Sequence, residues 1–241
     1  MTLSFPIIQH RSPNFDDRPV NAVIDTIIIH YTGMETPEDA LERLCDEGED
    51  ARARGRVSAH YMIYEDGRIV SLVNERDRAW HAGVSFFKGR TNLNNHSIGI
   101  ELVNCGHYIG YTDFPKAQMD ALIELCTGII QRHPIQKKLV LGHNDVAIGR
   151  KNDPGEKFDW AYLAKAGIGL WPVPEQKDYD SAQVYASSPS TLRGALIKFG
   201  YDPDASTDLM CMAFNRHFLS NADRSMGLEA CARLAWLNRQ P

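Results

Sequence analysis

The sequence lacks a long hydrophobic run and a surplus of positive charge. No apolar stretch approaches the ~20 residues that a membrane-spanning helix requires. The 26 Lys and Arg residues are outnumbered by 31 Asp and Glu residues, for a net charge of −5, which argues against nucleic-acid binding through a broad basic surface. Residues 1–6 contain neither the basic nor the apolar region of a signal peptide. We therefore expect a cytoplasmic protein, with a periplasmic location as the alternative if a signal sequence has been removed.

Cysteine is scarce, and its spacing does not suggest a disulfide framework. The five cysteines are odd in number and far apart in the sequence, and no Cys-x-x-Cys pair occurs. This pattern speaks against a cysteine-rich zinc site and predicts free thiols, mostly buried, in a reducing compartment. The cysteines are Cys45, Cys105, Cys126, Cys211 and Cys231.

Short apolar runs alternate with longer amphipathic segments in the first two thirds of the chain. The short runs at residues 23–29, which is β-branched, and at residues 97–103 and 139–141 predict strands. The 3.6-residue periodicity of residues 115–133 predicts a long helix. Because strands and helices interleave, we predict an α/β domain over residues 1–172, with a central mixed β-sheet flanked by helices.

The composition changes after Trp171. Residues 173–190 are rich in proline, serine and charged residues, which predicts a linker. Residues 191–241 contain three short helical patterns with apolar stripes. We therefore predict a small C-terminal three-helix domain joined to the α/β domain by a polar linker.

Two histidines stand where predicted strands end. His30 follows the run at residues 23–29, His143 follows the run at residues 139–141, and a turn-forming segment, residues 151–155, comes soon after. Catalytic zinc sites use three protein ligands of the imidazole and carboxylate type. Spacing alone leaves a metal site and a packing role both open, because the sequence has no compact His-Glu-x-x-His motif.

Six ordered segments extend over roughly residues 20–172: Ile28-Ile29-His30-Tyr31-Thr32, Val57-Ser58-Ala59-His60-Tyr61-Met62-Ile63, Ala79-Trp80-His81-Ala82-Gly83, Ser97-Ile98-Gly99-Ile100-Glu101-Leu102, Gly142-His143-Asn144-Asp145 and Lys151-Asn152-Asp153-Pro154-Gly155. Together they resemble the zinc-dependent N-acetylmuramoyl-L-alanine amidases of the amidase-2 type, a family that includes the peptidoglycan recognition proteins. Residues 191–241 more weakly resemble the three-helix peptidoglycan-binding domain that some of these amidases carry.

The resemblance implies a catalytic zinc centre. It implies zinc ligation by His30, His143 and Asp153. Glu101 falls at the family's acidic catalytic position, where it would exchange protons with water and the leaving amine. Lys151 falls at the basic position, where it would stabilise an oxyanion. The alternatives are a salt-bridged strand residue for Glu101 and a solvated loop residue for Lys151.

Four further residues are candidates for contacts with a substrate. His60 occupies a position where several relatives carry tyrosine. Trp80 and His81 lie in a glycine-flanked turn, where they would form the wall of a groove, although core packing is the alternative for Trp80. Asn95 precedes the strand that carries Glu101, as either a turn former or a substrate contact.

The resemblance implies a hydrolase that acts on peptidoglycan or muropeptide fragments. The bond to be cut is the amide between N-acetylmuramic acid, or its 1,6-anhydro form, and the L-alanine of the stem peptide. A peptidoglycan-binding protein without catalysis is the alternative, because one fold hosts many functions. A zinc peptidase that cuts within the stem peptide is a third reading. The complete set of ligands together with Glu101 and Lys151 favours the amidase.

Overall fold

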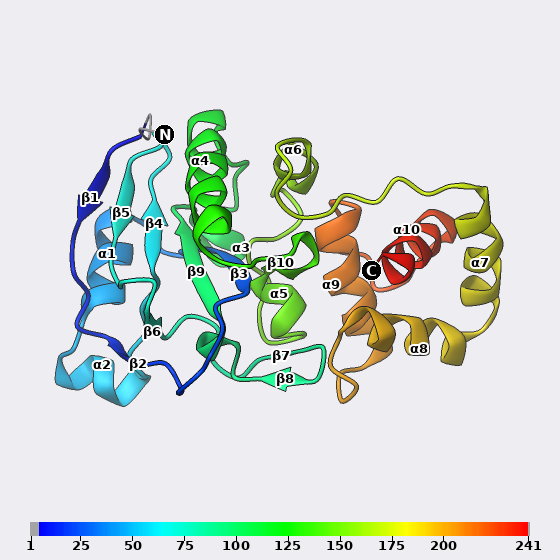
Figure 1. The fold of residues 1–241 in the computed structure, drawn as a ribbon, viewed down its shortest axis with the longest axis horizontal. Helices are drawn as coiled ribbons and strands as arrows, with labels where there is room; N and C mark the ends of the chain where they lie inside the picture. The colour runs from blue at the N-terminus through cyan, green and yellow to red at the C-terminus, as the bar shows by residue number, and fades with distance from the viewer. Residues whose placement is uncertain (1–4, 241) are drawn as a thin grey trace.

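The computed structural model describes residues 5–240, which form an α/β unit followed by a group of helices (Figure 1). A central sheet of six strands has the order β1-β5-β4-β9-β3-β10. Only β4 and β5 pair in antiparallel fashion, so the sheet is mixed, as predicted. In sheet order the strands are β1 (Ile7–Gln9), β5 (Ile69–Ser71), β4 (Tyr61–Ile63), β9 (Ser97–Leu102), β3 (Thr26–Tyr31) and β10 (Val140–Gly142).

Two short strand pairs lie outside the central sheet. Strands β2 (Phe15–Asp17) and β6 (Asp77–Ala79) pair in antiparallel fashion, and so do β7 (Phe86–Phe87) and β8 (Arg90–Thr91). The 3₁₀ turn η1 (Leu93–Asn95) leads into β9, and η2 (Lys137–Leu139) leads into β10.

The alternation of side chains along the strands gives the sheet two buried faces. Ile27 and Ile29 of β3 pack with helices α4 (Lys116–Arg132) and α6 (Trp160–Lys165). Ile28 packs in a different core, on the other face of the sheet. Helix α1 (Pro37–Cys45) packs its Ala40 and Leu44 against β4 and β5. Three short helices complete this unit: α2 (Glu49–Arg54), α3 (Gly106–Ile109) and α5 (His143–Val146).

The segment predicted to be a linker contains a helix, and this corrects the prediction for residues 173–190. Helix α7 (Gln176–Ser187) begins where the Asp178 carboxylate accepts a hydrogen bond from the Glu175 amide at 2.9 Å. Arg239 donates two hydrogen bonds to the same carboxylate, at 2.8 and 3.0 Å. The polar sequence conceals this helix because few of its residues are apolar: Ala182 is fully buried, and Tyr179 and Tyr185 pack against the same core.

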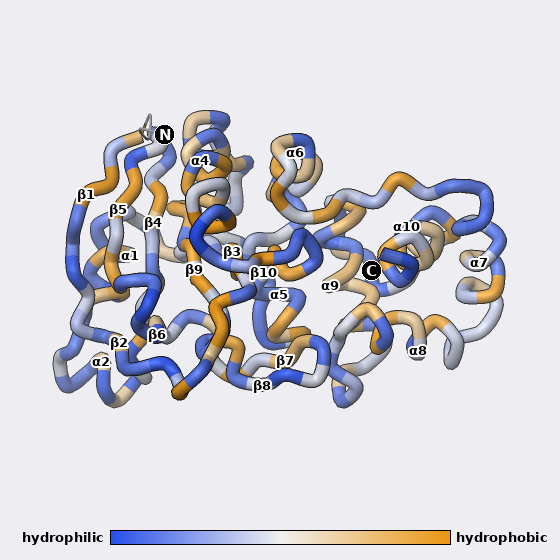
Figure 2. Tube along the Cα trace, viewed as in Figure 1, coloured by the Kyte–Doolittle hydropathy of each residue, from blue (hydrophilic) through white to orange (hydrophobic). Residues whose placement is uncertain are grey.

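The C-terminal region is therefore built of four helices where three were predicted. They are α7, α8 (Pro189–Phe199), α9 (Thr207–Phe218) and α10 (Leu228–Arg239), and we call these helices and the turns that join them the helical module. Figure 2 shows a hydrophilic stretch leading into α7, next to more apolar helices. In Figure 1, α9 lies beside α5 of the α/β unit.

The helical module and the α/β unit share one hydrophobic core. Ile28 and Leu141 of the sheet pack in the same cluster as Leu196, Met210 and Phe214 of the module. The sequence patterns had suggested a separate small domain with its own core. The module instead buries its apolar surface together with the α/β unit.

Two expectations from composition concern membranes and cysteine. Within residues 5–240, no helix combines the length and apolar character that crossing a membrane requires. All five cysteines are free; Cys126, Cys211 and Cys231 are buried, whereas Cys45 and Cys105 are half-buried.

Candidate metal centre

Neighbouring strands bring the two candidate histidine ligands together. His30 is the penultimate residue of β3, and His143 begins α5 immediately after β10. Strands β3 and β10 pair in parallel, with Gly142 opposite Ile29. The side chains of both histidines therefore start from the same end of adjacent strands.

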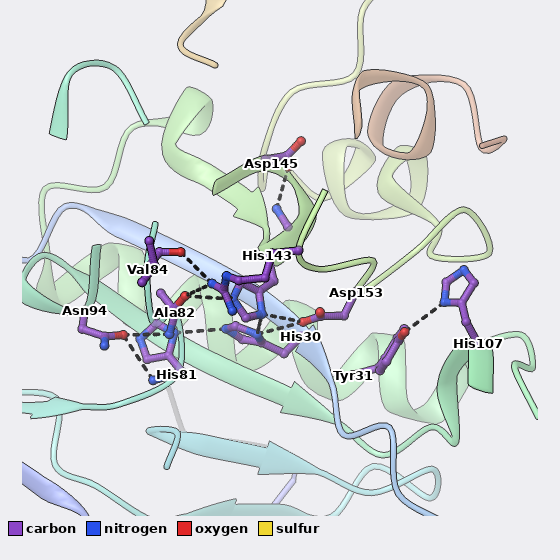
Figure 3. A network of polar contacts seen from close by, with 12 residues as sticks. His30, Tyr31, His81, Ala82, Val84, Asn94, His107, His143, Asp145 and Asp153 are labelled. Atoms are coloured by element: carbon purple, nitrogen blue, oxygen red, sulfur yellow. Dashed lines mark hydrogen bonds and ion pairs between the residues drawn. The ribbon is translucent and has the colours of Figure 1, made fainter. Parts of the chain in front are cut away.

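The third candidate ligand, Asp153, reaches this point from the loop after α5. The Asn144 amide donates a hydrogen bond to the Asp153 carbonyl at 2.9 Å, which ties the loop to the start of the helix. Asp153 Oδ2 lies 2.9 Å from His30 Nδ1 and 3.0 Å from His143 Nδ1. The two histidine Nδ1 atoms are themselves 3.0 Å apart. Three potential ligand atoms thus converge at one buried point (Figure 3).

The hydrogen bonds behind His30 determine where its proton lies. The Ser97 hydroxyl donates to the Leu93 carbonyl at 2.7 Å, so its oxygen accepts from His81 Nε2 at 3.1 Å. His81 Nδ1 then has no proton and accepts from His30 Nε2 at 3.0 Å. Burial and the neighbouring His143 lower the pKa of His30 to about 4, which keeps its ring neutral near pH 7. His30 Nδ1 therefore presents a lone pair to Asp153.

The hydrogen bond behind His143 has the same consequence. His143 Nε2 lies 3.0 Å from the Ala82 carbonyl, which can only accept, so Nε2 carries the proton. In the neutral ring, Nδ1 then presents a second lone pair. Two imidazole lone pairs and a carboxylate oxygen face one another without a shared proton, an arrangement that a bound cation would stabilise.

The set of donor atoms suits a catalytic zinc ion. Two imidazoles and one carboxylate form a three-ligand set of the kind found in catalytic zinc sites, and the second nitrogen of each histidine is hydrogen-bonded, as is usual for ligating histidines. Separations of 2.9 to 3.0 Å are a few tenths of an ångström shorter than the roughly 3.3 Å expected between tetrahedral ligands bonded at about 2.0 Å. His30, His143 and Asp153 therefore fit this ion.

Glu101 lies beside His30 because of strand register. Strands β3 and β9 pair in parallel, with His30 directly opposite Glu101. The Oε2 atom of Glu101 is buried without a hydrogen-bond partner. Burial raises the pKa of Glu101 well above its ordinary value, Asp153 raises it further, and Lys151 lowers it. The salt-bridged alternative for Glu101 finds no support, since no ion pair involves this carboxylate among the described residues.

A cavity of about 360 Å³ opens onto the converging ligands. Its walls include all five residues expected to carry the chemistry: His30, Glu101, His143, Lys151 and Asp153. Arg43 and Arg150 also line it, together with Tyr31 and Tyr108, and none of these four was singled out from the sequence. Arg150 directly precedes Lys151 in the sequence, and this adjacency could have marked it as a candidate for the cavity wall.

Of the four predicted substrate contacts, only His81 lines the cavity. Both of its ring nitrogens are engaged, with His30 and Ser97, so it supports a ligand histidine and has no ring nitrogen left for a substrate. His60 is fully buried and accepts a hydrogen bond from the Gly99 amide through Nδ1. His60 therefore lies away from the cavity, which argues against its predicted substrate contact, whereas His81 forms part of the cavity wall as predicted and its contact with a substrate stays a prediction.

The remaining two predicted contacts are also engaged within the protein. The Trp80 indole donates to Asp16 at 3.0 Å, and the Asn95 side-chain oxygen accepts from Arg78 at 2.8 Å. Neither residue lines the cavity. The asparagine of this turn that contacts the histidine cluster is the neighbouring Asn94, whose side-chain oxygen accepts from the amides of residues 81 and 82 (Figure 3). It thereby holds the segment that contacts both ligand histidines.

Comparison with known proteins places this chain in a family. The pattern of the N-acetylmuramoyl-L-alanine amidase family matches residues 19–156, more than half of the chain. The chain belongs to this family. It is therefore an amidase, as the six sequence segments predicted.

Relatives of this amidase extend the similarity beyond the matched segment. N-acetylmuramoyl-L-alanine amidase AmiD of Escherichia coli is 37% identical over 215 residues, which cover 81% of this chain and 75% of AmiD. The 1,6-anhydro-N-acetylmuramyl-L-alanine amidase AmpD of Haemophilus influenzae is 39% identical over 165 residues, which cover 63% of this chain and 87% of AmpD.

Solved structures share the mixed α/β fold of this amidase. AmpDh3 from Pseudomonas aeruginosa superposes with a TM-score of 0.77 at 34% identity, covering 89% of this chain and 91% of that one. The complex of E. coli AmiD with anhydro-N-acetylmuramic acid-L-Ala-D-γ-Glu-L-Lys gives a TM-score of 0.76 at 33% identity, with 91% of each chain covered. The predicted mixed α/β fold is thus confirmed, and so is the class of enzyme.

Proposed function

We propose that this amidase is a zinc amidohydrolase that cleaves the amide bond between N-acetylmuramic acid, or its 1,6-anhydro form, and the L-alanine of the stem peptide. The observation that carries the proposal is the convergence of two imidazole lone pairs and one carboxylate oxygen on a cavity that also contains Glu101. His30, His143 and Asp153 would hold the ion. When bound, zinc supplies Lewis acidity, which polarises an amide carbonyl and acidifies water.

The residues of the chain divide the remaining chemistry between them. Glu101 takes a proton from the attacking water and delivers it to the departing amine, so that the C–N bond breaks and a carboxylic acid forms. The buried Oε2 atom of Glu101 has no hydrogen-bond partner within the described residues, so it need not break a hydrogen bond before it accepts the proton. The ammonium group of Lys151, at the cavity wall, stabilises the negative charge that develops on the carbonyl oxygen.

The charges of the cavity support an anionic substrate. Arg43, Arg150 and Lys151 contribute three cations to its walls, and stem peptides carry free carboxylates. The AmiD structure holds an anhydromuramyl peptide of this kind. We infer that muropeptides are the substrates and that the tyrosines of the wall, Tyr31 and Tyr108, contact them.

Product analysis tests the proposal directly. Purified protein is expected to contain about one zinc per chain, and mass spectrometry of a digested anhydromuramyl tripeptide should show free peptide beginning with L-alanine. Chelation should stop the reaction and added zinc should restore it. Binding of the muropeptide without release of peptide would favour the non-catalytic alternative, and cleavage after L-alanine would favour the peptidase.

The predicted wall-binding role of residues 191–241 and the predicted cytoplasmic location stay predictions. Two relatives of this chain are named after different substrates: AmiD after N-acetylmuramoyl-L-alanine, and AmpD after its 1,6-anhydro form. Parallel assays on soluble anhydromuropeptides and on whole sacculi address the substrate: a strong preference for sacculi would argue against a cytoplasmic recycling role.

A further inference from the structure

We propose that helix α9 of the helical module is a positioning element of the metal centre, acting through Arg216 and His217 on the two segments that carry His143 and Asp153. This inference rests on the proposed zinc site. It assigns to the module a task in building the active site, distinct from any binding of cell-wall polymer.

The first contact acts on the segment that carries His143. Asp145, two residues further along α5, is fully buried, and its carboxylate accepts from the Gly142 amide at 2.7 Å. The same carboxylate contacts His217 Nδ1 at 2.7 Å and accepts from the Tyr201 hydroxyl at 2.9 Å. Both outer partners belong to the helical module. These two partners hold the Asp145 carboxylate in place. That carboxylate caps helix α5, whose first residue is His143.

The second contact acts on the segment that carries Asp153. Arg216 donates to the side-chain oxygen of Asn152 at 2.9 Å and to the Glu156 carboxylate at 3.2 Å. Asn152 lies between Lys151 and Asp153, and Glu156 follows three residues later. One guanidinium therefore bridges the two ends of the ligand-bearing turn, which suits the planar fork of arginine.

Burial makes both contacts rigid. Arg216 and His217 are 7% and 2% exposed. The His217 ring stacks between Trp160 and Phe218, with ring centroids 3.7 and 3.9 Å away. Close by, the Asn144 side chain donates to the Ala213 carbonyl of α9 at 3.1 Å. Arg216 and His217, consecutive residues of one well-packed helix, thus contact the segments that carry Asp153 and His143.

The physical consequence is a module that affects metal affinity without touching the metal. Ligands held in place by further hydrogen bonds lose less freedom on binding the ion, and removal of such supporting partners typically weakens metal binding by about 10–100-fold. By contrast, Arg239 makes a comparable pair of hydrogen bonds within the module, to Asp178 in α7. Its loss should affect the fold of the module and leave the ligand segments in place.

The test compares Arg216→Met with Arg239→Met in the full-length protein. Zinc dissociation constants are measured by competition with a chromophoric chelator, alongside thermal unfolding of the zinc-free protein and kcat and KM on a soluble anhydromuropeptide. We expect Arg216→Met to raise the zinc dissociation constant by about 10–100-fold and to lower kcat. Arg239→Met should lower the melting temperature while the zinc dissociation constant stays within about twofold of the wild type.

Two more variants separate positioning from general loss of stability. Arg216→Lys keeps the charge but not the fork, so it should recover only part of the zinc affinity. His217→Phe keeps a stacked ring but removes the nitrogen that contacts Asp145, so it should weaken zinc binding measurably; it provides the test if Arg216→Met does not fold. In a double-mutant cycle, Asn152→Ala should add little to Arg216→Met if Arg216 acts through Asn152.

The outcomes distinguish this inference from the proposed function. A wild-type protein that binds no zinc contradicts the proposed function itself. Wild-type zinc affinity in both Arg216→Met and His217→Phe, with the wild type zinc-loaded, overturns the role of α9 and leaves the amidase proposal intact.

Discussion

The two histidines of the centre are supported in different ways. His30 depends on His81, Ser97 and the Leu93 carbonyl, a chain of hydrogen bonds that stays within the α/β unit. The segment of His143 depends on Asp145, which is held by Tyr201 and His217 of the helical module.

The difference lies in the part of the molecule that supplies each support. His30 and His81 are 51 residues apart and both belong to the α/β unit, whereas His217 lies 72 residues from Asp145, in the helical module. One half of the centre is therefore complete once the sheet has formed. The other half becomes complete only when the last third of the chain packs against α5, so we expect the two halves to respond differently to mutation.

The largest effect should come from removing a ligand on either side. His30→Ala and His143→Ala are each expected to abolish stoichiometric zinc binding and to reduce turnover to background, because a catalytic site needs all three protein ligands. Zinc analysis and muropeptide turnover on the same preparations provide the check. Full activity in a zinc-free His143→Ala protein would refute the site.

Glu101 and Lys151 should separate zinc binding from catalysis. Glu101→Gln should retain zinc and lose about 10²–10⁴-fold in kcat, since an amide cannot take the proton from water. Lys151→Met should retain zinc and lose about 10²–10³-fold, the usual effect of one missing oxyanion donor. Melting temperature is the control, because purely structural roles would lower it while turnover stayed near normal.

An intermediate effect is expected where His30 is supported. His81→Leu removes both ring nitrogens and should weaken zinc binding by about 10–100-fold, similar to the loss of other groups that orient metal ligands. Ser97→Ala removes only the hydroxyl at the far end of this series of hydrogen bonds, so it should weaken zinc binding less than His81→Leu does. If His81→Leu bound zinc as tightly as the wild type, the proton arrangement deduced for His30 would be wrong.

The smallest effect should come from an ion-pair network that touches neither half of the centre. Burial alone would raise the pKa of Glu75, but hydrogen bonds from Arg132, His133 and Tyr61 outweigh it and lower the pKa to about 2. A carboxyl group whose pKa is lower in the folded state stabilises the fold at pH values above its unfolded pKa, and that stabilisation is lost as the pH falls through the folded pKa. The window for Glu75 is therefore roughly pH 5 to 2.

Glu75→Gln should reduce the free energy of unfolding near pH 7 by about 1–3 kcal/mol. It should also flatten the dependence of that free energy on pH within this window. Urea unfolding of the zinc-free protein at a series of pH values measures both. Zinc affinity at pH 7 serves as the control and should not change.

The sequence predicted those parts of the site that local patterns encode. Short apolar runs indicated the strands, and strand ends followed by turns made His30 and His143 candidates for a metal site. Asp153, Glu101 and Lys151 came from the resemblance to a family, and all five line one cavity. Their assigned roles stay predictions until the variants above are measured.

Contacts between distant segments could not be predicted in this way. The roles of Arg216 and His217 depend on how α9 packs, and no spacing in the sequence expresses that. His60 and Asn95 were chosen by position along the chain, yet the fold buries the first and turns the second towards Arg78. Helix α7 was missed because hydrophobic periodicity is a poor guide where few residues of a helix are apolar.

The register of β3 against β9 has a consequence for how the enzyme can vary. His30 and Glu101 share a face because they are paired residues of parallel strands, and side chains alternate between faces with every residue. A single-residue insertion in either strand before this pair would turn one of the two functional groups into the core around α4. Engineered or natural length changes should therefore accumulate in the loops around the cavity, while these two strands keep a constant length.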